Sequence, residues 1–281
     1  MSELDMDKIA AEYDRDGFVR IREGLIAKEE FAELKEALTE LENNGTIDTN
    51  SQTLQNLNDS VFLHPAFEKL ARNPKVIALI EKVLNNKFDL QHSKMINKYL
   101  TQGANANIKW HQDYPFFPHT NYDLVALALH FDDEPDEAGP INFLTGTHKI
   151  GIIPHNNPET GEFMYQITDP NFKPEDYERV SVNCNAGDIT LHHGNVIHAS
   201  APNNGALRRV FYLQFRAIDA MQFAGVIWKS TGFSPYANPP KRDFARFVDG
   251  TKIDVRSFGK IFDKYGRLAP DEATHANIST Y

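Results

Sequence analysis

Residues 187 to 200 read Gly187-Asp188-Ile189-Thr190-Leu191-His192-His193-Gly194-Asn195-Val196-Ile197-His198-Ala199-Ser200. This is the pattern of a short strand that ends in a glycine-containing turn and is followed by a further histidine. Similar short alternating segments, separated by Gly, Pro and Asn, flank it. Our strand candidates are residues 88–100, 107–112, 124–132, 140–144, 179–184, 187–192 and 208–217. Many short strands with turn signals between them are typical of a sandwich or barrel, so we expect a mostly β fold.

The segment before these strands is predicted to be mainly helical. Residues 16–21 follow a turn signal and alternate, which predicts a short opening strand. Apolar residues then recur at helical spacing from Phe31 to Leu41. Asn73 and Pro74 predict the start of another helix, because asparagine caps helices and proline suits their first turn. We expect these helices to pack against one side of the sheet.

We predict a single domain over residues 1–281. It divides into a helical part at about 1–87, a barrel core at about 88–217 and a C-terminal extension at 218–281 whose pattern is mixed. Residues 151–178 are rich in proline and asparagine and predict a long loop or lid inside the core. Loops of that length in a compact domain are often functional.

The net charge of −10 makes nucleic acid and anionic membranes unfavourable partners, because repulsion works against both. The chain has one cysteine, which excludes an intramolecular disulfide and cysteine-rich zinc sites. No apolar run approaches the length of a membrane span, and the first residues do not form a signal peptide. We therefore expect a cytoplasmic protein whose partners are a small-molecule substrate and O2.

Two histidines and an aspartate are candidates for a metal site. His111 and Asp113 lie two positions apart on an extended segment, so both side chains can converge on one ion. His198 supplies a second imidazole, and two imidazoles with one carboxylate form the facial triad of non-haem Fe(II) oxygenases. Such a triad leaves three coordination positions open, two for a chelating 2-oxo acid and one for O2. By itself the His-x-Asp pair also fits an ordinary surface contact, and His192 or His193 could replace His198.

Arg209 and Ser200 indicate what else the site binds. Arg209 follows His198 by eleven residues and alternates with Phe211, Leu213 and Phe215, which predicts an arginine on a mainly apolar inward face. A buried guanidinium needs an anionic partner, and its fork matches a carboxylate. The distal carboxylate of 2-oxoglutarate would be that partner, with the Ser200 hydroxyl as a further donor. The alternative is a structural ion pair between Arg209 and an acidic side chain.

Taken together, these motifs resemble the phytanoyl-CoA dioxygenase-like family of Fe(II)/2-oxoglutarate oxygenases. The matching motifs, in chain order, are His111-Gln112-Asp113, Glu137-Ala138-Gly139-Pro140, Leu144-Thr145-Gly146-Thr147-His148, Gly187-Asp188, His198-Ala199-Ser200 and Arg209. Residues 13–19 are also similar to the family's opening, so the likeness extends over about residues 10 to 217.

The resemblance implies a double-stranded β-helix, a jelly-roll or cupin-like barrel with N-terminal helices on one side. It also implies Fe(II) as the metal, 2-oxoglutarate as co-substrate, and hydroxylation of an unactivated C–H bond with release of succinate and CO2. In such enzymes a polar residue on the strand before the His-x-Asp motif binds the C1 end of 2-oxoglutarate. Lys94 is our choice among the candidates Gln91, Lys94, Asn97 and Lys98.

The substrate is not marked by any motif. Tyr114, Phe116 and Phe117 directly follow the His-x-Asp motif and are predicted to wall its pocket, with His155 and Trp228 as further candidates for substrate contact. No basic cluster marks a CoA phosphate site, which favours a small polar or amino-acid-like metabolite. Two alternatives stay open: a zinc-dependent hydrolase on a cupin-like barrel, and a barrel that binds a ligand without catalysis.

Overall fold

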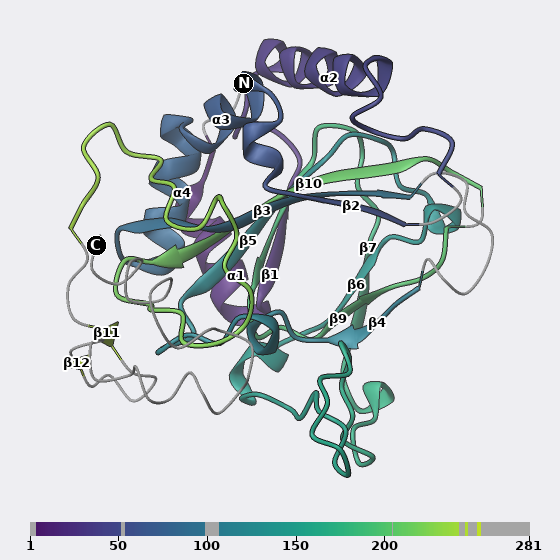
Figure 1. The fold of residues 1–281 in the computed structure, drawn as a ribbon, viewed down its shortest axis with the longest axis vertical. Coiled ribbons are helices and arrows are strands. Elements are labelled where there is room, and N and C mark those ends of the chain that lie inside the picture. The colour runs from purple at the N-terminus through teal and green to yellow at the C-terminus, as the bar shows by residue number, and fades with distance from the viewer. Residues whose placement is uncertain are drawn as a thin grey trace.

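Two antiparallel β-sheets form the body of the protein. The computed structural model describes residues 4–51, 54–98, 107–203, 205–241, 245–246 and 252–253. The larger sheet has the order β1 (Phe18–Ile21), β8 (Ile189–His193), β5 (Leu124–His130), β10 (Arg208–Ala217), β3 (Phe88–Lys98) and β2 (Gln55–Asn58) (Figure 1). The smaller sheet has the order β4 (Ile108–His111), β9 (His198–Ser200), β6 (Ile141–Leu144) and β7 (Arg179–Val182). A separate short pair joins β11 (Ala245–Arg246) to β12 (Lys252–Ile253).

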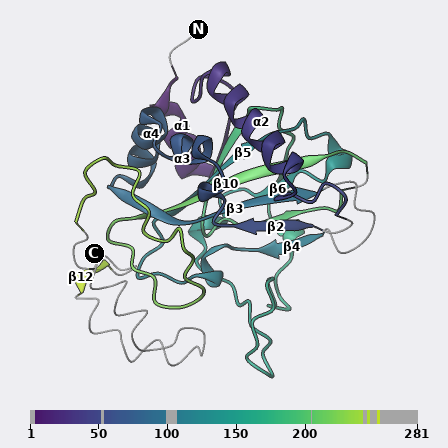
Figure 2. The ribbon, with the colours of Figure 1, turned by 45° about the horizontal axis from the view of Figure 1, so that its top comes forward.

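Four helices cover one face of the larger sheet, as Figure 2 shows. They are α1 (Met6–Asp16), α2 (Lys28–Asn43), α3 (Pro65–Ala71) and α4 (Pro74–Leu84). The central strands β5 and β10 are buried on both faces, which explains the nearly continuous apolar run of β5. The main hydrophobic core lies between the helices and this sheet, where the rings of Phe67 and Phe211 pack with centroids 4.7 Å apart.

The alternation of β10 decides which side chains reach which side of the larger sheet. Phe211, Leu213 and Phe215 belong to the core under the helices. Val210 and Tyr212 point the other way, toward the smaller sheet, where they pack with Ile96 of β3. Side chains of even number on β10 therefore face the space between the two sheets.

Helix α4 begins as the sequence predicts. The Asn73 side chain accepts a hydrogen bond from the backbone N–H of Lys75 at 2.8 Å, and Pro74 occupies the first turn. The Nδ2 of Asn73 also donates to Glu30 of α2 at 2.8 Å. One cap residue therefore both starts α4 and ties it to its neighbouring helix.

Gly139 allows the close approach of β6 and the segment that follows β9. Its φ of +64° lies in the left-handed region, and a Cβ at this position would be 2.3 Å from the carbonyl oxygen of Ala201. Only glycine fits both constraints. This gives a physical reason for glycine in the Ala138-Gly139-Pro140 turn.

The double-stranded β-helix that the sequence predicts is confirmed, with two further strands in its two main sheets. All seven predicted core strands and the opening strand are present, with somewhat different bounds. The strand β2 was not predicted, because Gln-Asn-Leu-Asn is polar and pairs only at the sheet edge with β3. The strand β9 was not predicted as a strand either, since it contains only three residues.

The connections carry short 3₁₀ helices. They are η1 (Ser60–Phe62), η3 (Tyr114–Phe116), η4 (Asp136–Ala138), η5 (Thr147–Lys149) and η6 (Pro174–Asp176). The predicted loop 151–178 projects from the barrel at the lower end of Figure 1 and contains η6. Most of the predicted C-terminal extension lies outside the described residues. Among the helices that are described, none is long and apolar enough to cross a membrane.

Replacing Asn73 with alanine is expected to lower the free energy of unfolding by about 1–2 kcal/mol, because the cap of α4 is lost. Chemical denaturation followed by far-UV circular dichroism measures this. Glu36→Ala, on the exposed face of α2, is the control and should have little effect. Equal stabilities for the two variants would contradict the role of the cap.

Candidate metal centre and co-substrate pocket

The pairing of β4 with β9 brings the predicted metal ligands together. His111 is the register partner of His198 across these antiparallel strands. Asp113 follows two residues later, immediately before the 3₁₀ helix η3. The ligand atoms of all three side chains lie within 4.8 Å of one another, and all three residues are buried. The structure thus assembles the predicted triad from two neighbouring strands.

Backbone carbonyls fix the orientation of both imidazoles. The Nδ1 of His111 contacts the carbonyl oxygen of Lys109 at 2.8 Å, and the Nδ1 of His198 contacts that of Val196 at 3.0 Å. Because a carbonyl only accepts, each Nδ1 carries the proton and each Nε2 presents a lone pair. Burial is the main cause that lowers the pKa of His111 and of His198, so both are neutral. Neutral imidazoles are the form that binds a metal.

Asp113 is ionised and held by a third histidine. The Nε2 of His192 donates to Oδ2 of Asp113 at 3.2 Å, and Oδ1 lies 3.8 Å from the Nε2 atoms of His111 and His198. Burial alone would raise the pKa of Asp113, but the hydrogen bond from His192 and the nearby His198 hold it well below its usual value. His192 is therefore hydrogen-bonded to the carboxylate and lies outside the group of His111, Asp113 and His198 that could hold a metal ion.

Gln112, between the two ligands, anchors the segment to the rest of the barrel. Its side-chain Nε2 donates to the carbonyl oxygens of Gly151 and Asn195, both at 2.8 Å. Its Oε1 accepts from the backbone N–H of Ile153 at 2.9 Å. A side chain with this many buried bonds gives the ligand segment little freedom to move.

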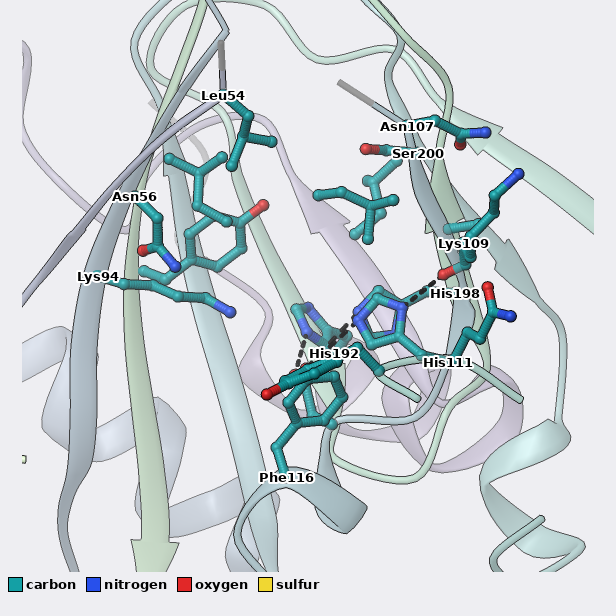
Figure 3. Close-up of a pocket in the computed structure, with 18 of the residues that line it drawn as sticks. Leu54, Asn56, Lys94, Asn107, Lys109, His111, Phe116, His192, His198 and Ser200 are labelled. Atoms are coloured by element: carbon teal, nitrogen blue, oxygen red, sulfur yellow. Dashed lines mark hydrogen bonds and ion pairs between the residues drawn. The ribbon is translucent and has the colours of Figure 1, made fainter. Parts of the chain in front are cut away.

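A cavity of about 350 Å³ opens beside the triad (Figure 3). It lies between the two sheets, and residues of the loop 151–178 close part of its rim. The predicted residues Lys94, Phe116 and Ser200 line it. The other lining residues are Leu54, Asn56, Ile96, Asn107, Ile108, Lys109, His111, Asp113, Ile141, Met164, Tyr165, Gln166, His192, His198, Ala199, Arg208 and Tyr212.

Arg209 does not face this cavity, so that part of the prediction is wrong. It lies on the helix-covered side of β10, where Nη2 contacts Asp132 at 2.6 Å and Nη1 contacts Glu42 at 2.7 Å. These contacts are the structural ion pair that the sequence left open as an alternative. Burial would lower the pKa of Arg209, but its bonds to Asp132 and Glu42 raise it above its ordinary value.

Arg208 is the arginine that lines the cavity. Its Nε donates to the buried carboxylate of Glu134 at 2.8 Å, and Glu134 also contacts the ring of His130. The Nη2 of Arg208 is buried and has no hydrogen-bond partner in the described part of the chain. Burial would raise the pKa of Glu134, but the charge of Arg208 holds it at about 2, so the pair is ionic. The unpartnered Nη2 is suited to an anion.

Three aromatic residues predicted to contact substrate lie away from the cavity wall. The hydroxyl of Tyr114 donates to the carbonyl oxygen of His119, and its ring packs on Tyr122 at 4.9 Å. Phe117 and Trp228 instead pack around His92, which is buried and stacked on Trp228 at 4.5 Å. None of the three lines the cavity, so the structure gives them packing roles.

His155 has a supporting position as well. Its Nε2 accepts a hydrogen bond from the backbone N–H of Gln112 at 3.0 Å, and its Nδ1 contacts the carbonyl oxygen of Ile153 at 2.7 Å. It does not line the cavity. From the loop 151–178, the residues that do so are Met164, Tyr165 and Gln166, which carry no recognisable motif.

Comparisons with known proteins agree with this geometry. The model of the phytanoyl-CoA dioxygenase (PhyH) family matches residues 13–211. The chain belongs to this family. The match includes all three triad residues, Ser200 and Arg208, whereas the C-terminal part lies beyond it.

Relatives in this family carry diverse names. The protein named "Probable alpha-ketoglutarate-dependent hypophosphite dioxygenase" of Stutzerimonas stutzeri is 34% identical over 163 residues, which cover 57% of this chain and 56% of that protein. The L-proline trans-4-hydroxylase of Streptomyces griseoviridis is 25% identical over 52% of this chain and 60% of its own length. The matched part thus spans less than two thirds of each of these relatives.

Solved structures share the fold. The epimerase SnoN from nogalamycin biosynthesis, in complex with Fe3+, alpha-ketoglutarate and nogalamycin RO, superposes with a TM-score of 0.62 at 24% identity, over 76% of this chain and 84% of that one. EctD from S. alaskensis with 2-oxoglutarate and 5-hydroxyectoine gives a TM-score of 0.62 at 16% identity, over 86% and 85% of the two chains.

Removing the His192 side chain tests the assembly of the triad. His192→Phe is expected to weaken Mn(II) binding about 10- to 100-fold, because Asp113 loses its orienting partner. Asp113→Ala should weaken it further, since a ligand is lost. Isothermal titration calorimetry with Mn(II) measures both effects.

The matched control is His193→Gln, because His193 is the next residue of the same strand and packs against Tyr13 and His148 instead of the triad. Its Mn(II) affinity should match that of the wild type. If His192→Phe and His193→Gln weakened binding equally, the loss would reflect general destabilisation, and the assigned role of His192 would be wrong.

Proposed function

We propose that this chain is an Fe(II)/2-oxoglutarate-dependent dioxygenase that hydroxylates an unactivated C–H bond of a small-molecule metabolite. The reaction consumes substrate, 2-oxoglutarate and O2 and yields the hydroxylated product, succinate and CO2. The observation that carries the proposal is one cavity lined both by the His111–Asp113–His198 triad and by Arg208, whose buried Nη2 has no partner among the described residues. Among the relatives, the hypophosphite enzyme is named as an alpha-ketoglutarate-dependent dioxygenase, and the L-proline trans-4-hydroxylase is named for hydroxylation at carbon.

The donor set fits iron(II). Two neutral imidazoles and one carboxylate on one side of the ion leave its other side open, as in the facial triad of non-haem iron oxygenases. Iron bound there supplies the chemistry that couples decarboxylation of 2-oxoglutarate to oxidation of a C–H bond. The contribution of the chain is to hold, orient and shield the reactants.

The distal carboxylate of 2-oxoglutarate is assigned to Arg208 and Ser200. Both line the cavity, and the Nη2 of Arg208 lacks a partner among the described residues. A charge-assisted bond to a carboxylate would satisfy this buried donor. A zinc hydrolase that activates water at the same triad has no use for such an arginine, which favours the oxygenase over that alternative.

Lys94 is proposed to bind the C1 carboxylate. Figure 3 shows its amino group extending into the cavity from β3, on the wall opposite His111 and His198. The Nζ atom lies 5.3 Å from the centre of the Tyr212 ring. Lys94 is the register partner of Tyr212, whereas Arg208 pairs with Lys98 four residues further along β3, which leaves the Arg208 end for the distal carboxylate.

The substrate is proposed to be small and polar. A volume of about 350 Å³ must hold both 2-oxoglutarate and the part of the substrate that reacts. Polar side chains from several segments surround the remaining space, among them Asn56, Asn107 and Gln166, while Phe116 and Tyr165 provide apolar surface. Hydroxylation of a small polar metabolite is also consistent with the names of the hypophosphite and L-proline enzymes among the relatives.

Adding 2-oxoglutarate to the anaerobic Fe(II) protein should produce a visible metal-to-ligand charge-transfer band. The absorbance of this band, followed as 2-oxoglutarate is added, gives the dissociation constant of the co-substrate. Arg208→Ala is expected to raise this constant on the order of a hundredfold or more, because the charged partner of the distal carboxylate is lost. Ser200→Ala should raise it about tenfold, the effect of one hydrogen bond.

Arg209→Ala is the matched control, since it removes the neighbouring guanidinium, which pairs with Asp132 and Glu42. It should leave the dissociation constant unchanged. If Arg208→Ala does not fold, Ser200→Ala and Arg208→Lys still test the assignment. Absence of the band in the wild type would refute the oxygenase, and succinate formation during turnover would exclude the barrel without catalysis.

A further inference from the structure

Lys98, at the end of β3, is fully buried beside the pocket. Its Nζ donates to Oγ of Ser200 at 2.7 Å and to the carbonyl oxygen of Ala201 at 2.8 Å. Within the described residues it forms no ion pair. The carboxylate that attracts it, Glu134, is bonded to Arg208. In its ammonium form, a lysine buried in these surroundings is only partly compensated by its neighbours.

The hydrogen bonds of Lys98 suit its neutral form. A neutral amine has two N–H donors and an ammonium has three, whereas the described surroundings supply two acceptors. Burial, followed by the positive charge of Arg208, lowers the pKa of Lys98 to about 7. Both forms are therefore present near neutral pH.

The next residue in the chain of contacts is Ser200, which lines the cavity. Because its Oγ accepts from Lys98, its own hydroxyl hydrogen is directed to a different acceptor. A carboxylate between Ser200 and the unpartnered Nη2 of Arg208 would receive that hydrogen. The same anion would place a negative charge close to Lys98 and favour its ammonium form.

We propose that Lys98 takes up a proton from solvent when a carboxylate binds between Ser200 and Arg208, so that binding of the dicarboxylate co-substrate is coupled to protonation behind the pocket wall. In this step Lys–NH2 and H+ become Lys–NH3+, and no other bond changes. The inference rests on the proposed function, because that function identifies the dicarboxylate as 2-oxoglutarate. Lys98 acts through Ser200 and is a positioning residue.

The neighbouring groups narrow down which side chain takes up the proton. From β10, Arg208 stays charged, and burial raises the pKa of Tyr212 to about 12. Burial would raise the pKa of Glu134, but Arg208 holds it at about 2. His130 of β5 contacts Glu134 and is unchanged in every Lys98 variant below. Proton uptake that persists in these variants would therefore come from a residue other than Lys98, such as His130.

Isothermal titration calorimetry of 2-oxoglutarate into the Mn(II)-loaded protein, in buffers of different ionisation enthalpy, counts the protons taken up. We expect almost none at about pH 6, where Lys98 is already charged, and close to one at about pH 8. The dissociation constant should rise with pH above neutrality, with a limiting slope of about tenfold per pH unit.

Lys98→Arg keeps the charge and removes the titration, so 2-oxoglutarate should still bind while the difference in proton uptake between low and high pH disappears. Lys98→Met should bind 2-oxoglutarate more weakly and also lack this proton uptake. It tests the proposal if arginine cannot be accommodated at position 98. Lys87→Arg is the matched control, because this exposed lysine directly precedes the same strand and pairs with Glu81 away from the cavity. Its proton uptake should equal that of the wild type.

The outcomes distinguish the inference from the function on which it rests. Binding with no uptake, or with equal uptake in wild type and in both Lys98 variants, would overturn the role of Lys98 and leave the oxygenase intact. Failure of the wild-type Mn(II) protein to bind 2-oxoglutarate at all would instead refute the proposed function.

Discussion

The antiparallel pairing of β4 with β9 is the interaction on which the site depends. It places His111 opposite His198, and it brings Ser200 alongside, two residues further along β9. The strands are short, so their register needs support from outside. Gln112 supplies it through its bonds to the loop 151–178 and to the turn before β9, and Gly139 lets β6 approach from the other side. A slip of β4 by one residue would turn the His111 side chain to the face opposite that of His198.

Much of the fold and the triad could be predicted from sequence, because both depend on local rules. Alternation located the core strands, the cap at Asn73 located α4, and a spacing of two on an extended segment directed His111 and Asp113 to one ion. The roles of residues that depend on tertiary packing could not be predicted in this way. Nothing local shows that His155 accepts from the backbone of Gln112, or that the ring of Tyr114 turns toward Tyr122.

Arg208 lines the cavity, although the sequence predicted Arg209. Strand alternation shows which residues share a face, but it does not show which of the two faces of the sheet lines the pocket. The sequence showed correctly that Arg209 shares a face with Phe211, Leu213 and Phe215, but a larger sheet of this fold has two buried faces. The more apolar face packs against helices, and the mixed face, with Tyr212, lines the pocket. A functional guanidinium belongs on the mixed face, since a closed apolar core has no room for a ligand. That contrast was present in the sequence and would have favoured Arg208.

The central claim is that one cavity holds iron through the triad and the far end of 2-oxoglutarate through Arg208. The most direct measurement is a crystal structure of the anaerobic complex with Fe(II) and 2-oxoglutarate. The account predicts iron bound to His111, Asp113 and His198, with the distal carboxylate contacting Arg208 and Ser200. A metal bound elsewhere, or a 2-oxoglutarate carboxylate that reaches neither Arg208 nor Ser200, would contradict it.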